Sequence, residues 1–205
     1  MEQYFTNNPN LKSELRNIVY KYDDYQLDFL SDNGVFSKDK LDFGSNLLLE
    51  VMYKNINDGL NILDVGCGYG FIGISLAKIK KANVTLCDVN KRALHLASKN
   101  MVLNEVEVQV KESNCYSAIT DRYDLIVTNP PIRAGKEIVY KILDEARDHL
   151  ESYGELWFVI RKDQGAKSTI EHLSANYECT VVEKRKGFYI VKAKIRWQGN
   201  KCIIQ

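Results

Sequence analysis

The stretch NILDVGCGYGFIGISLA, residues 61–77, decides the fold. It opens with a short apolar run at 62–65 and continues with glycines at positions 66, 68 and 70. A helix-like apolar pattern over 71–77 follows. This order predicts a buried strand, a tight glycine turn and a helix whose N-terminus faces a ligand. Because glycine permits positive φ and has no Cβ, such a turn lets the backbone approach a small molecule closely.

The glycine turn fits two classes of cofactor. The pattern G-x-G-x-x-G at 68–73 matches the dinucleotide fingerprint, and Asp88 lies about twenty residues further on, as that fingerprint requires. The pattern D-x-G-x-G-x-G at 64–70 matches the loop that holds S-adenosylmethionine (SAM) in class I methyltransferases. A carboxylate at Asp64 suits the ammonium of SAM and would repel a pyrophosphate. The turn therefore favours SAM, while a dinucleotide and a ligand-free turn stay open.

Composition limits the class of protein. The chain has 205 residues and a net charge of +1, which suits one α/β domain without a global basic field. Its cysteines are odd in number and never in CxxC spacing: Cys67, Cys87, Cys115, Cys179 and Cys202. This pattern favours reduced thiols over a disulfide frame or a zinc site. Since we find no signal peptide and no membrane-spanning run, we expect a cytoplasmic protein with no metal and no membrane partner.

From residue 60 onward, patterns typical of strands and helices alternate. We expect strands at 60–65, 83–88, 106–110, 123–128 and 154–161. We expect helices at 71–80, 90–100, 136–150 and 165–175. Two further strands, 177–184 and 187–196, end the chain with no helix between them. The prediction is an α/β, Rossmann-like fold: a mostly parallel seven-stranded sheet that ends in an antiparallel hairpin and carries helices on both faces.

Residues 1–45 form a lead-in that we expect to pack on the core, followed by the main domain at 46–205 within one structural domain. Alternating patterns at 16–22 and 25–30, separated by two aspartates, predict a β-hairpin in the lead-in. Ser45 is expected to cap a helix over 46–54.

A second motif, Asn129-Pro130-Pro131-Ile132, follows the predicted strand at 123–128. Ligands bind at the carboxyl ends of strands in open α/β sheets, so Asn129 should lie on the same rim as the glycine turn. Two prolines make the loop rigid and remove its N–H groups. The Asn129 side-chain oxygen and the Pro130 carbonyl then remain as acceptors for the two hydrogens of an exocyclic amine. We therefore predict SAM as the cofactor, methyl transfer to nitrogen, and Asn129, Pro130 and Pro131 as catalytic residues.

Six motifs that span nearly the whole chain carry a family resemblance. They are Tyr4-Phe-Thr-x-Asn-Pro9, Gly34-Val-Phe-Ser-Lys38, Leu41-Asp-x-Gly-Ser45, the glycine turn, Thr128-Asn-Pro-Pro131 and Lys186-Gly-Phe-Tyr189. With them the chain resembles the 16S rRNA (guanine-N2)-methyltransferase family of class I SAM-dependent methyltransferases, in a single-domain form. The resemblance implies methyl transfer from SAM to an exocyclic amine of a base in RNA, most directly guanine N2 of small-subunit rRNA. It also implies rRNA or the small ribosomal subunit as the partner.

The predicted site has a cofactor part and a substrate part. The cofactor part contains Asp64, Gly66, Cys67, Gly68, Gly70, Asp88, Val89, Asn114 and Asn129. The substrate part contains Phe36, Lys38, Ile132 and Arg133. Asp88 is expected to accept hydrogen bonds from the ribose hydroxyls of SAM, with a helix cap as the alternative. Lys38 and Arg133 are expected to bind phosphates.

Three alternatives to guanine methylation stay open. Many family members have an aromatic residue after Asn-Pro-Pro that stacks on the target base, and this chain has Ile132 there. Methylation of adenine N6 or of a protein glutamine amide therefore remains possible, because Asn-Pro-Pro suits any planar nitrogen. The third alternative is a non-catalytic module that binds SAM or RNA, and the oligomeric state is also open.

Overall fold

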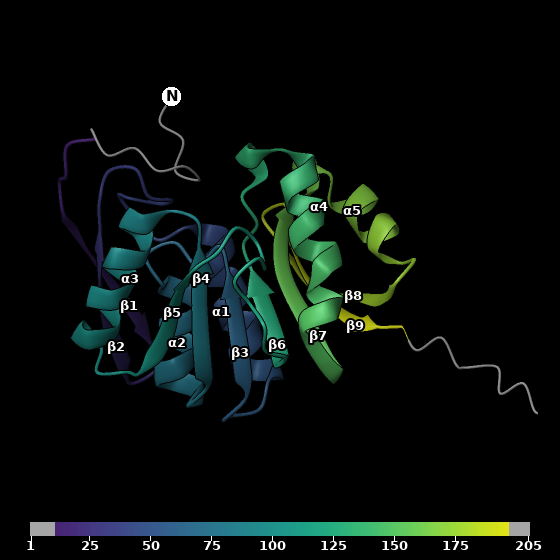
Figure 1. The fold of residues 1–205 in the computed structure, drawn as a ribbon, viewed down its shortest axis with the longest axis horizontal. Helices are drawn as coiled ribbons and strands as arrows, with labels where there is room; N and C mark the ends of the chain where they lie inside the picture. The colour runs from purple at the N-terminus through teal and green to yellow at the C-terminus, as the bar shows by residue number, and fades with distance from the viewer. Residues whose placement is uncertain (1–10, 197–205) are drawn as a thin grey trace, which may run out of the picture.

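A computed structural model describes residues 11–196, so the Tyr4-to-Pro9 motif and Cys202 lie outside the described residues. The main sheet contains β3 (Asn61–Val65), β4 (Asn83–Asp88), β5 (Val108–Glu112), β6 (Tyr123–Thr128), β7 (Leu150–Arg161), β8 (Tyr177–Arg185) and β9 (Phe188–Ile195). Its seven strands lie in the order β5-β4-β3-β6-β7-β9-β8 (Figure 1). The predicted strand at 106–110 is displaced to Val108–Glu112, and it forms one edge of the sheet.

The last strand is the one that reverses direction. Neighbouring strands from β5 to β7 pair in parallel, whereas β9 pairs antiparallel with both β7 and β8. The final hairpin therefore does not simply extend the sheet, because its second strand is inserted between β7 and its first strand. The predicted mostly parallel seven-stranded sheet is confirmed.

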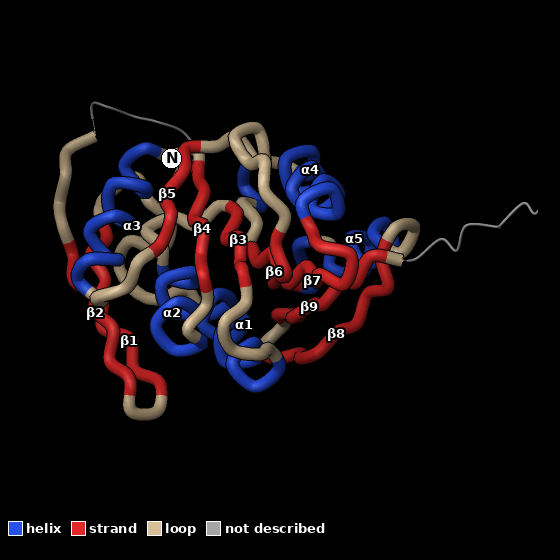
Figure 2. The backbone as a smooth tube through the Cα atoms, turned by 60° about the horizontal axis from the view of Figure 1, so that its bottom comes forward, coloured by secondary structure: helices blue, strands red, loops and turns tan. Residues whose placement is uncertain are grey.

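Helices cover both faces of this sheet (Figure 2). Consecutive residues of a strand point to opposite faces, so Ile62 and Leu63 of β3 belong to two separate cores. The first core holds the helices α1 (Phe43–Asn55), α2 (Phe71–Lys80) and α3 (Lys91–Leu103), and the second holds α4 (Lys136–Glu145) and α5 (Ala166–Leu173). The continuously apolar central strands follow from burial on both sides. Within residues 11–196, no helix is long and apolar enough to cross a membrane.

The predicted hairpin is present as β1 (Arg16–Tyr22) and β2 (Tyr25–Ser31), and it packs beside α3. Two asparagine side chains, those of Asn100 in α3 and of Asn104 at its C-cap, bond the free edge of β2 as a third strand would. Asn104 accepts from the Asp28 N–H at 3.0 Å and donates to the Asp28 carbonyl at 2.8 Å. Asn100 makes the same pair of bonds with Leu30. Residues four apart on a helix and two apart on a strand have similar spacing, which lets the two amides match the strand edge.

The structure corrects the predicted bounds of two helices. The first helix begins at Phe43, and its N-cap is Asp42, whose Oδ2 accepts the Ser45 N–H at 2.7 Å. Ser45 therefore lies inside the first turn and does not cap the helix. The helix expected at 136–150 is an α-helix only as far as Glu145 and continues as a 3-10 helix over Ala146–His149, because Leu150 already pairs with Tyr123 as the first residue of β7. Sheet pairing and full burial of Leu150 therefore outweigh the helical spacing of the apolar residues over 136–150.

Candidate functional site

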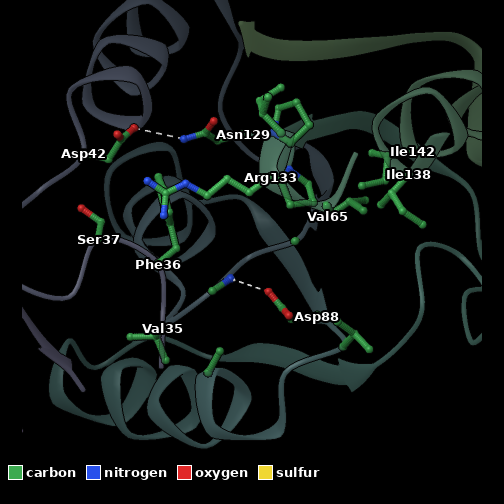
Figure 3. A pocket seen from close by; sticks show the side chains of 18 of the residues that line it. Val35, Phe36, Ser37, Asp42, Val65, Asp88, Asn129, Arg133, Ile138 and Ile142 are labelled. Atoms are coloured by element: carbon green, nitrogen blue, oxygen red, sulfur yellow. Dashed lines mark hydrogen bonds between the residues drawn. The ribbon is translucent and has the colours of Figure 1, made fainter. Parts of the chain in front are cut away.

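A pocket of about 800 Å³ opens at the carboxyl ends of the parallel strands β3, β4 and β6 (Figure 3). It joins most of the residues that the sequence predicts. Those lining it are Phe36, Lys38, Gly66, Gly68, Asp88, Val89, Asn114, Asn129, Pro130, Pro131, Ile132 and Arg133. Predicted cofactor and substrate residues therefore face one continuous space, as two reacting groups require.

The glycine turn leaves its backbone open to this pocket. Gly66 and Gly68 have φ values of +71° and +55°, which L side chains rarely adopt. A Cβ added at either position would meet no protein atom within 4 Å. The turn is held in place because the Gly66 and Cys67 N–H groups both donate to the Cys87 carbonyl, at 2.9 and 3.0 Å. The result is a fixed backbone cradle with room for a ligand.

Asp88 lies at the end of β4 and faces the pocket. Its Oδ2 accepts from the Gly68 N–H at 2.9 Å, and its Oδ1 accepts from the Asn90 N–H at 2.8 Å. Burial raises the pKa of Asp88 above its ordinary value, while these N–H donors oppose the rise. Asn90 is the N-cap of α3, so Asp88 is not the cap. Each carboxylate oxygen keeps lone pairs for a ligand hydroxyl.

Asp64, Cys67 and Gly70 do not line the pocket. The Asp64 side chain is 1% exposed, and its Oδ2 accepts from the Gly73 N–H in the first turn of α2 at 2.9 Å. Burial raises the pKa of Asp64 to about 7; the Gly73 N–H opposes this rise and the negative charge of Asp88 adds to it. Burial likewise raises the pKa of the Cys67 thiol well above its usual range. Asp64 thus lies behind the turn and is bonded to the start of α2, whereas Cys67 and Gly70 belong to the turn itself, where the Gly70 N–H donates to the Cys67 carbonyl at 3.0 Å.

Asn129 has its amide nitrogen tied back to α1. Its Nδ2 donates to Asp42 Oδ2 at 3.0 Å (Figure 3). It also donates to Ser45 Oγ at 2.8 Å. With both amide hydrogens used, the Oδ1 atom is left as the free acceptor at the pocket wall. The strand before it is fixed as well, since Thr128 Oγ1 donates to the Val65 carbonyl at 2.8 Å.

The two prolines form a tight turn. Pro131 has φ −75° and ψ 79°, and the Ile132 N–H donates to the Pro130 carbonyl at 2.8 Å, which defines an inverse γ-turn. The Pro130 carbonyl was predicted to be a free acceptor, but this bond already uses one of its lone pairs. One lone pair remains, so Asn129 Oδ1 is the stronger candidate for an acceptor.

The segment 34–40 and the Asn-Pro-Pro loop border the pocket from two sides. In Figure 3, Arg133 extends from the loop across the pocket toward Phe36. The 34–40 segment is anchored at its start, because Asn90 Nδ2 donates to the Gly34 carbonyl at 2.9 Å. Nearby, Arg92 pairs with the buried Asp32 at 3.1 Å. Lys38 donates from Nζ to Asn33 Oδ1 at 3.2 Å.

Among the lining residues that the sequence does not predict are Asp42, Arg161, Gln164 and Phe188. Asp42 and Phe188 stand inside motifs that were recognised for the family resemblance, so a signal for them existed. Arg161 enters the site because its strand pairs with β9 at Phe188, and its guanidinium lies 5.4 Å from the Phe188 ring centroid. That pairing is a long-range contact with no local sequence signal.

These features fit the predicted cofactor. The open backbone at Gly66 and Gly68 can receive its polar groups, and Asp88 offers acceptors for two ribose hydroxyls. No group of three His, Cys, Asp or Glu side chains among residues 11–196 is placed to hold a metal ion.

Comparison with known proteins gives the family. The model of the methyltransferase small domain matches residues 26–192, which is most of the chain. The chain belongs to the methyltransferase small-domain family. The SAM-dependent methyltransferase class predicted from the sequence is confirmed, with S-adenosylmethionine as the cofactor.

Individual relatives of this methyltransferase differ in length. YbxB, an uncharacterised protein of Bacillus subtilis (strain 168), is 43% identical over 198 residues, covering 94% of this chain and 98% of YbxB. Ribosomal RNA small subunit methyltransferase C of Haemophilus influenzae (strain PittEE) is 36% identical over 154 residues, covering 71% of this chain and 46% of that protein. This methyltransferase thus spans about half the length of the relatives that carry the methyltransferase C name.

A solved structure extends the likeness to three dimensions. The 16S rRNA N2 methyltransferase RsmC of T. thermophilus, in complex with AdoMet and guanosine, superposes with a TM-score of 0.81 and 25% identity. The alignment covers 92% of this chain and 52% of that chain. The Rossmann-like fold and the resemblance to 16S rRNA (guanine-N2)-methyltransferases are both confirmed.

Proposed function

We propose that this methyltransferase transfers a methyl group from SAM to an exocyclic amine of a base in RNA, and that the acceptor is guanine N2 in small-subunit rRNA. The observation that carries the proposal is the orientation of Asn129, whose amide nitrogen is bonded to Asp42 and Ser45. Its Oδ1 is therefore a preset acceptor for an N–H group. Two relatives whose names state rRNA methylation support the choice of rRNA.

The cofactor would supply a methyl carbon that its sulfonium already activates. The chain therefore has to bind and orient the two reactants and to stabilise the charge that develops during transfer. Gly66 and Gly68 would receive the polar end of SAM along the open backbone. Asp88 would accept from the ribose hydroxyls, and Val89 and Asn114 would border the adenine. Asp64, Cys67 and Gly70 would serve the same site by maintaining the shape of the turn.

Asn129 would act on the acceptor amine. The NH₂ group of a base is a poor nucleophile because its lone pair is delocalised into the ring. An acceptor fixed at Asn129 Oδ1 holds one N–H in place and stabilises the positive charge that grows on nitrogen during attack. Alignment of two bound reactants can supply up to roughly 7–11 kcal/mol of the barrier reduction. The Pro130–Pro131 turn keeps N–H donors, which would oppose that charge, away from the amine.

The remaining lining residues would hold the RNA. Phe36 and Ile132 would contact the base through apolar surface, and Lys38 and Arg133 would bind phosphates beside the flipped or unpaired nucleotide. Ile132 is too short to stack broadly on a purine, so the aromatic surface in this pocket comes from Phe36 and Phe188.

Labelled-methyl transfer tests the proposal. The purified enzyme would be given labelled SAM with small subunits assembled from unmodified rRNA, naked rRNA, tRNA and total protein, followed by nucleoside and amino-acid analysis. We expect N2-methylguanosine in the small subunit or its rRNA. N6-methyladenosine would move the activity to adenine, and labelled glutamine would move it to protein. SAM binding without transfer to any of the four substrates would favour a non-catalytic module.

A further inference from the structure

One oxygen of Asp42 serves two groups at once. Asp42 Oδ2 accepts the Ser45 N–H at 2.7 Å as the N-cap of α1, and it accepts Asn129 Nδ2 at 3.0 Å. The second bond joins segments 87 residues apart in the sequence. A helix cap does not need it, so it calls for an explanation of its own.

We infer that Asp42 is a positioning residue, which holds the Asn129 amide so that Oδ1 faces the amine to be methylated. The inference rests on the proposed function. An ionised carboxylate has no hydrogen to donate, so the Asn129 atom beside it has to be the NH₂ group. Ser45 Oγ takes the other hydrogen at 2.8 Å. A flipped amide would lose the bond to Asp42 and bring two oxygens together, whereas the Ser45 hydroxyl can bond either amide atom, so Asp42 sets the orientation.

The helix gives this contact its rigidity. Asn129 lies in a loop after β6, whereas Asp42 and Ser45 belong to the start of α1. Helix α1 is anchored by side chains that are at most 1% exposed, among them Leu47, Leu48 and Leu49. The acceptor in the loop is thus fixed against a packed helix. The Asp42 charge also polarises the amide, which makes Oδ1 a better partner for a nitrogen that becomes positive.

Asp42→Ser separates capping from positioning. Serine is a good N-cap, so α1 should keep its start and the melting temperature should change little. Its shorter, neutral side chain cannot reach Asn129. We expect kcat for methyl transfer to fall on the order of 10- to 100-fold, with the KM for RNA and the Kd for SAM changed by less than about twofold. The matched control is Asn46→Ala, which removes a bond to Glu50 from the same turn and should leave kcat unchanged.

A double-mutant cycle asks whether Asp42 works through Asn129. In an Asn129→Ala background, measured by single-turnover transfer of labelled methyl, Asp42→Ser should cost no further activity. Additive losses would overturn the inference, because they would mean that Asp42 acts on the reaction by another route.

A second readout does not depend on activity. The side-chain NH₂ signals of Asn129 can be identified in ¹⁵N spectra by their absence in Asn129→Ala. Their hydrogen exchange with water should quicken about tenfold or more in Asp42→Ser and stay unchanged in Asn46→Ala. Unchanged exchange in Asp42→Ser overturns the inference. If exchange quickens while the wild-type enzyme methylates no RNA, the proposed function fails and the orienting contact stands.

Discussion

Asn100 bonds both backbone groups of Leu30, accepting from its N–H at 2.7 Å and donating to its carbonyl at 2.9 Å. The same Nδ2 atom donates to the Tyr69 carbonyl in the glycine turn at 2.8 Å. One fully buried amide therefore joins the N-terminal hairpin, helix α3 and the cofactor turn. A change in the hairpin can reach the pocket through this residue.

Asn100→Asp should destabilise the fold strongly. The aspartate keeps an acceptor for Leu30 N–H, but it loses the donor to two carbonyls and buries a charge. We expect a loss of about 3 kcal/mol in the free energy of unfolding, measured by urea denaturation at neutral pH. Asn17→Asp, the same change at an exposed position of β1, is the control and should stay within about 0.5 kcal/mol of wild type. Equal effects at both positions would contradict the bridging role of Asn100.

Alanine at Gly68 should mainly weaken SAM binding, whereas alanine at Gly73 should mainly lower stability. At Gly68 the added Cβ enters open pocket space, so SAM binding should weaken at least about tenfold, with about 1 kcal/mol lost to backbone strain. At Gly73 the Cβ would lie 2.2 Å from Leu86 Cδ2 and 2.9 Å from Val84 Cγ1. There we expect a stability loss of about 1–3 kcal/mol. Calorimetry with SAM and urea denaturation of both variants check this; loss of binding without loss of stability at Gly73 would argue against it.

Asp64 should make stability depend on pH. Its pKa is about 7 in the folded protein, against an ordinary value of 3.8, so the unfolded chain releases this proton first. Stability contributed by Asp64 is present at low pH and is lost as pH rises from about 4 to 7. The free energy of unfolding of Asp64→Asn should therefore rise relative to that of wild type by on the order of 2 kcal/mol between pH 5 and pH 8. Asp24→Asn, in the exposed β1–β2 turn, should show no such trend. A constant gap between Asp64→Asn and wild type would disprove the buried, protonated carboxyl.

Asn129→Ala should separate binding from chemistry. The side chain is proposed to contact the acceptor amine, so we expect kcat to fall at least about 100-fold while SAM affinity changes by less than about threefold. Single-turnover assays and calorimetry measure the two quantities. Turnover close to wild type would rule out Asn129 as the key acceptor.

Three lysines beside the pocket should contact RNA. Lys162 lies next to the β8–β9 turn, with its N–H bonded to the Gly187 carbonyl at 2.8 Å, and Lys184 and Lys186 belong to that turn region. Arg185 is paired with Glu50 and Glu183, whereas within residues 11–196 none of the three lysines has an ion pair.

Replacing Lys184 and Lys186 by serine should weaken RNA binding and lower the slope of log K against log salt by about 1.5, because two phosphate contacts are lost. Fluorescence anisotropy over a salt series gives the slope, and SAM affinity should not change. Lys21 and Lys99, both exposed, serve as the paired control. An unaltered slope in the variant with Lys184 and Lys186 replaced would show that the β8–β9 turn region does not contact RNA.

Local sequence signals predicted the parts of the site that a single strand–turn–helix unit builds. The glycine turn, Asp88 and Asn129 are each placed at the end of one strand, and the rule for open α/β sheets brings those ends together. The sequence could not reveal which atom of Asn129 faces the pocket, because this depends on Asp42, 87 residues away.

The wrong predictions have the same origin. Ser45 and Asp42 are both good cap residues, and only the folded helix shows that the aspartate is used. The helical spacing of apolar residues continues to Leu150, but pairing with Tyr123 places that residue in a strand. The role of Asp64 at the cofactor stays a prediction, but the sequence did not reveal that its Oδ2 accepts from the Gly73 N–H. Contacts between residues far apart in the sequence decide each of these cases, and a local sequence pattern does not show such contacts.

The position of β9 has a consequence for the order in which the enzyme matures. A ribosome delivers β7 and β8 before β9, yet β9 lies between them and forms hydrogen bonds with both. Until it arrives, β7 has an unpaired edge and β8 has no neighbour in the sheet. Phe188 is the first residue of β9, so this wall of the pocket is added last. A nascent chain can thus complete its cofactor turn well before it can enclose a substrate, and catalytic competence waits for the final strand.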